Sequence, residues 1–339
     1  MKRAFSDGQL NFLVGVNILV LVCAAVLSGA DFLDPYNLQS MASQIPELGL
    51  LAIGVMLAMV SGNGGIDLSG IALANLSAVL AGMLAPELVS PDTAPNAYAL
   101  AFCAVALTVG LLGGLLNSVL IAVVGLTPIL CTLGTQLFFT GMAVALTNGS
   151  GVRVDGAGFL ETLGYENVLG IPWSFALFAL IALAIGGWMS FSPNGVRLFL
   201  MGTNARAAQY AGVPRTRMLT MVYTLSGILA SVAGIVIAAR TSSAKWDYGS
   251  SYVLIAILIV VMAGVRPEGG YGRMICLVLS ATALQILSST FNFLDISNFF
   301  RDCAWGLLLL LFLASSRIDL KAFWPQASHK GTAAGQPPL

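Results

Sequence analysis

Five ionisable residues lie within or beside the apolar stretches of the sequence, and they are the first candidates for chemistry. They are Glu47, Asp67, Arg240, Arg301 and Asp302, and four of the five lie at the ends of those stretches. Ion-coupled transporters and pumps usually carry several ionisable groups near the middle of the membrane. Only Glu47 is expected deeper, either as an outer-half residue that snorkels or bonds locally, or in a substrate or structural role.

Motifs for covalent chemistry and metal binding are missing from the sequence. It has no Gly-x-x-x-x-Gly-Lys-Ser/Thr phosphate loop, no His-Glu-x-x-His motif and no Gly-x-Ser-x-Gly motif. The cysteines lack Cys-x-x-Cys spacing and lie in or beside apolar stretches, so we expect small buried thiols, with no disulfide and no metal site. These cysteines are Cys23, Cys103, Cys131, Cys276 and Cys303. The single histidine, His329, lies in the polar tail. We predict no catalytic residue.

The composition identifies the solvent in which such a chain folds. Of the 339 residues, 58% are hydrophobic and 9% are charged, whereas a soluble domain carries about 25% charged residues. So few charges cannot cover the surface of a soluble enzyme. The composition therefore excludes a soluble fold, a disordered chain and a nucleic-acid binder, and it predicts an all-α integral membrane protein.

Hydropathy predicts about ten membrane-spanning helices, which together form one transmembrane domain over residues 1–323. The third is the least apolar and is a candidate for a partly re-entrant segment, and the eighth is short. The stretch 12–29 is longer than the core of a secretory signal, so we interpret it as an uncleaved helix. The ten spans are 12–29, 39–61, 66–85, 97–124, 128–147, 172–191, 218–239, 251–265, 273–290 and 299–315.

The basic residues predict the orientation. With both termini in the cytoplasm, eleven of the fifteen Lys and Arg residues fall on the cytoplasmic side and four outside, in agreement with the positive-inside rule. Two connections are long, a Gly-rich outer loop at 148–171 and a basic inner loop at 192–217. Residues 324–339 are rich in Pro, Gly and Ala, which predicts a flexible cytoplasmic tail.

The inner loop predicts a short helix over residues 204–212. Asn204 is a favoured N-cap, the following alanines favour helix, and Gly212 supplies a stop just before Pro214. So short a helix is marginal in water unless it docks on something. Its small alanine face would admit a close partner, with arginines beside the membrane. A plain surface loop is one interpretation of this segment, and a docking helix for a cytoplasmic partner is the other.

Four sequence motifs in this chain are similar to the motifs of one known family and occur in the same order. With them the chain resembles the ribose-type ABC sugar permeases, the membrane-spanning subunits of ribose, xylose, arabinose and galactose uptake systems, over about residues 40 to 315. The groups are Gly64-Gly65-Ile66-Asp67-Leu68-Ser69; Gly114–Asn117 with Pro128–Thr135 and Gly141; Asn204–Val213 with Tyr223–Ala230, Ala233-Gly234 and Ala239-Arg240; and the glycine-rich turn Gly264–Gly272.

Two departures from the family pattern concern the substrate and the pairing of chains. Gly70-Ile71 stands where the family has Val-Gly after Ser69, and Ile259–Gly264 differs from the family's Ala-Val-Val-Ile-Gly-Gly. These departures leave open which sugar or polyol is carried, and whether the chain pairs with itself or with a sister permease.

The resemblance implies an ABC importer permease fold in the bacterial cytoplasmic membrane, crossing it many times. It implies a second permease chain, cytoplasmic ATPase subunits, a periplasmic sugar-binding protein and no nucleic-acid partner. The cofactor ATP-Mg would bind the ATPase subunits, and this chain would hold none. The helix at 204–212 would be the coupling helix, docking through Asn204, Ala205, Arg206, Ala208 and Gly212.

A sugar pathway requires neutral polar groups, because sugars carry many hydroxyls and no charge. The candidates are Asp67, Ser69, Asn75, Asn117, Thr132, Thr135, Gln136 and Gln285. Capping of the third helix is the alternative for Asp67 and Ser69, and helix–helix hydrogen bonding is the alternative for the amides. The leading function is import of a monosaccharide or related polyol. The alternatives are an ion-coupled secondary transporter of a small polar solute and a membrane enzyme.

Overall fold

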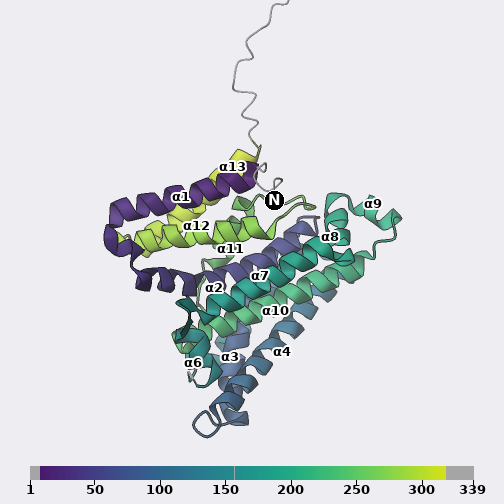
Figure 1. The fold of residues 1–339 in the computed structure, drawn as a ribbon. Helices are drawn as coiled ribbons and strands as arrows, with labels where there is room; N and C mark the ends of the chain where they lie inside the picture. Colours follow the sequence, from purple (N-terminus) through teal and green to yellow (C-terminus); the bar gives the residue numbers. More distant parts are fainter. Residues whose placement is uncertain (1–7, 156, 318–339) are drawn as a thin grey trace, which may run out of the picture.

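The computed structural model describes residues 8–155 and 157–317 of the chain. In this part of the chain, long helices pack side by side into a bundle, and the two sheets have only two strands each (Figure 1). The predicted tail at 324–339 lies outside the described residues.

Each of the ten predicted spans corresponds to a helix, so the prediction of an all-α membrane protein with about ten such helices is confirmed. Eight of the described helices are long and apolar enough to cross a membrane. The third begins at Gly70, four residues later than predicted, because residues 66–69 form no regular secondary structure. The helices are α1 (Gly8–Ser28), α2 (Pro35–Val60), α3 (Gly70–Leu88), α4 (Pro95–Ala122), α5 (Pro128–Thr147), α7 (Trp173–Phe191), α10 (Arg215–Thr241), α11 (Tyr252–Met262), α12 (Met274–Phe293) and α13 (Asn298–Arg317).

Local sequence explains where several of these helices begin and end. Pro35 is the first residue of α2, where the missing N–H costs nothing, and the Asp34 side chain accepts a hydrogen bond from the Tyr36 N–H at 2.7 Å. Pro128 begins α5 in the same way, and Asn148 ends it in the left-handed conformation at φ 50°. The chain therefore specifies these boundaries without help from distant residues.

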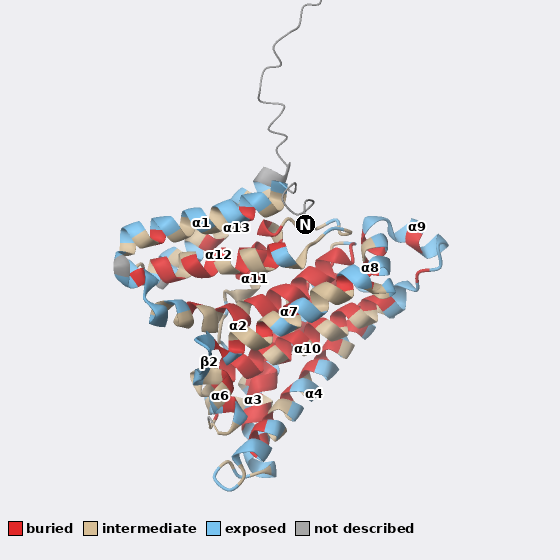
Figure 2. Cartoon of the chain, in the orientation of Figure 1, coloured by how far each residue is buried: buried red, intermediate tan, exposed pale blue. Residues whose placement is uncertain are grey.

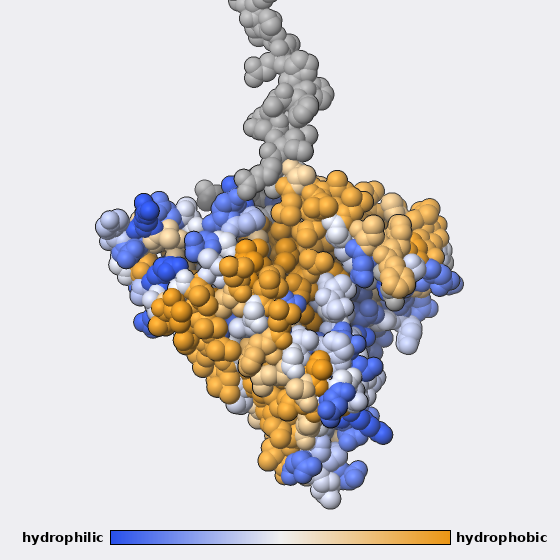
Figure 3. Space-filling view, turned by 180° about the vertical axis from the view of Figure 1, so that it is seen from behind, coloured by the Kyte–Doolittle hydropathy of each residue, from blue (hydrophilic) through white to orange (hydrophobic). Residues whose placement is uncertain are grey.

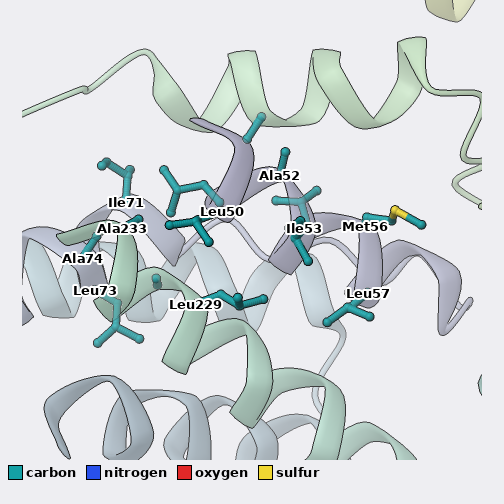
Figure 4. Packing of buried hydrophobic residues seen from close by; sticks show 14 of the residues in the cluster. Leu50, Ala52, Ile53, Met56, Leu57, Ile71, Leu73, Ala74, Leu229 and Ala233 are labelled. Atoms are coloured by element: carbon teal, nitrogen blue, oxygen red, sulfur yellow. The ribbon is translucent and has the colours of Figure 1, made fainter. Parts of the chain in front are cut away.

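The core lies where α2, α3, α4 and α10 meet, and Figure 2 shows it as the buried centre of the bundle. Leu50, Ile53 and Leu57 of α2 pack there beside Leu73 of α3 and Leu229 of α10 (Figure 4). Glycines bring α4 and α10 close together. A Cβ on Gly227 would lie 2.4 Å from the Gly110 carbonyl oxygen and 2.6 Å from the Gly114 Cα. Such small residues replace the hydrophobic effect as the main determinant of helix contact in a membrane.

Large apolar side chains also cover the outside of the bundle. Leu112, Leu137 and Leu183 are each more than half exposed, and Figure 3 shows broad apolar surface over one side of the molecule. A soluble monomer rarely exposes so large an apolar patch. This surface fits a lipid environment.

The connections are more structured than expected. The inner loop holds two helices, α8 (Pro193–Thr203), which was not predicted, and α9 (Ala205–Tyr210), which was. The Ser192 side chain caps α8 by accepting from the Gly195 N–H at 3.0 Å. At the other end of the bundle the predicted loop 148–171 also forms regular elements. The remaining elements are η2 (Ala30–Leu33), β1 (Val152–Arg153), α6 (Phe159–Tyr165), β2 (Asn167–Val168), β3 (Ile171–Pro172) and β4 (Ser243–Ala244), with β1 paired to β4 and β2 to β3.

Candidate functional site

Helix α9 forms where the sequence predicted a short helix. The Asn204 side-chain oxygen accepts a hydrogen bond from the Ala207 N–H at 3.0 Å, which makes Asn204 the N-cap as expected. The helix ends at Tyr210, and Gly212 follows in the left-handed region at φ 78°. Asn204 therefore caps the start of α9 and Gly212 follows its end, as predicted.

The exposed face of α9 differs from the predicted one. Ala205 and Arg206 are exposed, but Ala208 is 5% exposed and packs against this chain's own core. Ala208 cannot offer a surface to a partner, because it is the one residue of α9 that the chain itself buries. Tyr210 is 93% exposed and was missed by the sequence analysis. The sequence could have indicated Tyr210, because it is a single aromatic residue in a polar loop. Figure 1 shows α9 at one corner, away from the bundle.

A hollow of about 280 Å³ lies beside α9. Its walls come from the turn after α2, from α9 and from the start of α10, and they include Asn63, Arg206, Gln209 and Arg215. The hollow therefore joins the projecting helix to the end of α2, which is the most buried helix of the bundle.

Asp67 lies at the centre of a buried polar network. It is 4% exposed, although the sequence placed it at the end of a span. One carboxylate oxygen accepts from the Ser69 N–H at 3.0 Å and the Ser69 hydroxyl at 2.7 Å, and the other accepts from the Ser226 hydroxyl at 2.6 Å. Asp67 therefore organises the start of α3 and joins it to α10. Ser69 makes no capping bond with its own side chain, which corrects that part of the interpretation.

The network continues through α4 to α5. The Asn117 amide donates to the Ser69 hydroxyl at 2.8 Å and accepts from the Thr135 hydroxyl at 2.7 Å. The Thr132 hydroxyl donates to the Ile66 carbonyl at 3.0 Å. Five candidate pathway residues thus come together, and each is hydrogen-bonded to another candidate or to the backbone. This arrangement fits the helix–helix bonding alternative.

The other three pathway candidates lie apart from this network. The Asn75 amide of α3 donates to the carbonyls of Trp246 at 3.1 Å and Tyr248 at 2.9 Å. The Gln285 amide donates to the Gln44 side chain at 3.2 Å, between α12 and α2. Gln136 is partly exposed on α5. The eight candidates are therefore not one site.

Glu47 is the centre of a second buried cluster. Its carboxylate is 1% exposed and pairs with the Arg240 guanidinium. The hydroxyls of Tyr252 and Tyr248 donate to its other oxygen at 3.0 and 3.3 Å, and Arg240 donates to the Tyr248 hydroxyl at 2.8 Å. The bonding is not local, since it joins α2 to the end of α10 and the start of α11. We call Glu47, Arg240, Tyr248 and Tyr252 the Glu47 cluster.

The two clusters are separated by a cavity of about 10 Å³, lined by Tyr252 on one side and by Asp67 and Ser226 on the other. That volume corresponds to about one water molecule. A cavity of this size has no room for a sugar. Among the described residues, no three His, Cys, Asp or Glu side chains are grouped to hold a metal ion.

Comparison with known proteins matches residues 37–314 to one family, described as branched-chain amino acid transport system / permease component. The chain is 32% identical to the ribose import permease RbsC of Bacillus subtilis, over 91% of this chain and 94% of that one. It is 29% identical to the L-arabinose transport system permease AraH of Escherichia coli, over 95% of each. It is 28% identical to the autoinducer 2 import permease LsrD of Photorhabdus temperata, over 91% of each.

One solved structure has the same fold. It is described as an inward-facing conformation of a metal-chelate type ABC transporter, and the match has a TM-score of 0.50 over 92% of this chain and 97% of that one. The sequence identity is 18%, so the match supports the fold alone.

Proposed function

The chain belongs to the family of branched-chain amino acid transport system permease components, and from that membership we propose that it is the permease subunit of an ATP-driven sugar importer. As a member, it is a multi-pass membrane transport protein and not an enzyme. The proposed cargo is a monosaccharide or related polyol, and the proposed location is the bacterial cytoplasmic membrane. The end-to-end match to relatives named for ribose, arabinose and autoinducer 2 carries the proposal.

The charges of the two buried clusters are already neutralised or hydrogen-bonded within the bundle. A zwitterionic amino acid needs a fixed counter-charge for its ammonium group and another for its carboxylate. Glu47 and Arg240 neutralise each other, and hydroxyl and backbone N–H groups satisfy Asp67. The two buried clusters therefore leave no free charge to pair with the ammonium or carboxylate group of an amino acid.

We propose that α9 docks in a cytoplasmic ATPase subunit, which binds ATP-Mg and supplies the energy, while this chain binds no cofactor. A second permease chain, identical or a sister, would complete the membrane unit, and a periplasmic binding protein would deliver the sugar. Asn204 and Gly212 would shape α9, Ala208 would attach it to the bundle, and Ala205, Arg206 and Tyr210 would face the ATPase. Asp67, Ser69, Asn117 and Thr132 would hold the helices that enclose the pathway.

Replacement of Tyr210 tests the docking of α9. We expect Tyr210→Ala to lower both co-purification of the ATPase subunit and ATP-driven uptake about tenfold, because exposed aromatic residues are frequent anchors of interfaces. The measurement is a pull-down from detergent-solubilised native membranes, followed by ATPase and uptake assays. Phe191→Ala is the matched control, since Phe191 is a 90% exposed aromatic residue at the α8 end of α7.

Two results would contradict the proposal. If Tyr210→Ala and Phe191→Ala lowered co-purification and uptake equally, α9 would have no specific role in docking. If the unmodified chain purified without an ATPase subunit and took up solute in response to an ion gradient, the ion-coupled secondary transporter would replace the importer.

A further inference from the structure

The segment between α10 and α11, residues 242–251, reaches back into the bundle. We call it the strap. A Cβ on Gly234 of α10 would lie 2.4 Å from the Ala74 carbonyl oxygen of α3. Gly234 and Ala74 therefore lie at the same depth in the bundle. The next residue, Asn75, binds the strap carbonyls of Trp246 and Tyr248. Gly234 lies seven residues before the end of α10, so the strap descends about 10 Å below that end.

The short length of α11 agrees with this descent. Its 11 residues span about 16 Å, roughly half of the apolar thickness of a bilayer. The chain must therefore already be inside the bundle where α11 begins at Tyr252. That residue joins the Glu47 cluster near the middle of α2.

The strap cannot face lipid. Apart from β4, its backbone is irregular, and irregular backbone at membrane depth is tolerated only where protein buries it or where it lines a water-filled space. Lys245, Asp247 and Ser250 are exposed along it. Neither charged side chain has an ion-pair partner among the described residues. Asp247 lies between the two residues that Asn75 binds, and an exposed charge at that depth requires water or a polar ligand. Lys245 lies nearer the outer loop, against Gly151.

The strap is also held in place. Asn75 binds two of its carbonyls, the Trp246 indole N–H donates to the Gly149 carbonyl at 3.1 Å, and Tyr248 belongs to the Glu47 cluster. These anchors come from the loop after α5, from α3 and from α2. Lys245 and Asp247 therefore project from a backbone that three parts of the molecule fix, which lowers the entropic cost of binding a ligand.

We propose that the strap is a contact site for the transported sugar, with Lys245 and Asp247 as the residues that bind its hydroxyls. Lysine donates and aspartate accepts, and a sugar hydroxyl can do either, so the two together suit a polyol. Their charges cancel, so the pair does not favour a charged solute. This assignment rests on the proposed function, since it deepens the same transport activity.

The first test asks whether the strap borders water. We expect Asp247→Cys to react with a membrane-impermeant maleimide in native membranes. Leu183→Cys should not react, because Leu183 is 75% exposed on the apolar face of α7. Cys23 and Cys303, the exposed cysteines among the described residues, are first replaced with alanine. If the Asp247→Cys variant stayed unlabelled, the proposal would be overturned.

The second test separates sugar contact from docking of the binding protein. In proteoliposomes with the ATPase subunits, ATP and the binding protein loaded with radiolabelled ribose or arabinose, we expect Asp247→Ala and Lys245→Ala each to lower kcat about tenfold. The KM for the loaded binding protein should not change, because the sugar meets the strap after docking. Asp92→Ala, an exposed carboxylate at the same end of the bundle, should change neither quantity.

The outcomes distinguish this inference from the proposed function. If the unmodified complex takes up none of a panel of monosaccharides and polyols that includes ribose and arabinose, the proposed function is contradicted and the sugar contact with it. If it takes up sugar but the strap variants keep their kcat, the sugar contact alone is contradicted. A higher KM with unchanged kcat would overturn the sugar contact in favour of a docking surface.

Discussion

Glu47 is the clearest case of a side chain that obtains its role from distant residues. A carboxylate with 1% exposure is stable only because Arg240 neutralises it and two tyrosines bond to it. The sequence marked Glu47 as deep, since it lies within an apolar stretch. It did not pair Glu47 with Arg240, because 193 residues separate them. Tyr248 and Tyr252 were visible in the sequence but carried no specific signal.

The Glu47 pair makes a prediction at the residue scale. We expect Glu47→Gln to destabilise the fold by about 3 kcal/mol, because it leaves the Arg240 guanidinium without its counter-ion inside the bundle. Thermal unfolding of the detergent-solubilised protein measures the loss. Glu87→Gln, an exposed glutamate near the end of α3, should unfold like the unmodified protein. Equal melting temperatures for the two variants would show that the pair is energetically neutral.

At the scale of elements, α8 and α9 are joined to the bundle through backbone contacts. A Cβ on Gly202, near the end of α8, would lie 2.0 Å from the Val60 carbonyl oxygen and 2.4 Å from the Gly270 N. The Gly270 N–H itself donates to the Val60 carbonyl at 3.0 Å. The end of α2, the end of α8 and the turn after α11 therefore meet at one point. Movement of α9 can reach α2 by this route.

Gly202 provides the prediction at this scale. We expect Gly202→Ala to lower the free energy of unfolding by about 1–3 kcal/mol, because the added methyl group overlaps two backbones that cannot easily shift. Gly187→Ala is the control, since a Cβ at that position in α7 meets nothing within 4 Å. Denaturant unfolding in detergent compares the two variants. If Gly202→Ala were as stable as Gly187→Ala, the three-way contact would not be tight.

At the scale of the whole molecule, the two ends of the bundle differ in what they present. One end carries α9 with exposed Arg206 and Tyr210, and the other carries the loop 148–171 with the two small sheets. The distribution of Lys and Arg predicts that the α9 end faces the cytoplasm. The strap opens from the opposite end, which is where a delivered sugar would arrive.

Single cysteines at the two ends test this orientation. Leu169 is 98% exposed at the turn between β2 and β3, and Tyr210 is 93% exposed on α9. With Cys23 and Cys303 replaced by alanine, we expect Leu169→Cys to react with an impermeant maleimide in intact spheroplasts. In cells that lack the ATPase subunit, so that nothing covers α9, Tyr210→Cys should react only after the membrane is permeabilised. The reverse pattern would invert the topology and place the strap on the cytoplasmic side.

The sequence by itself determined that the chain folds in a membrane. It also determined the approximate number and position of the helices, and the short helix α9 with its Asn204 cap. These features follow from composition and from local hydrogen bonding, which act within one or two turns of the chain. The motif order also determined the family. The start of α3 was less accessible, because hydrogen bonds to α4 and α10 hold the residues before it. Helix α8 was missed although Ser192 and Pro193 are a local signal for its start.

Only the tertiary structure decided which polar residues meet. It brought Asp67, Ser69, Asn117, Thr132 and Thr135 into one satisfied network, turned Ala208 inward, and joined Glu47 to Arg240. A polar residue in a bundle must find a hydrogen-bond partner, but its type does not say which helix provides that partner. The packing of α2, α3 and α10 makes that choice, and the same packing draws the strap into the bundle.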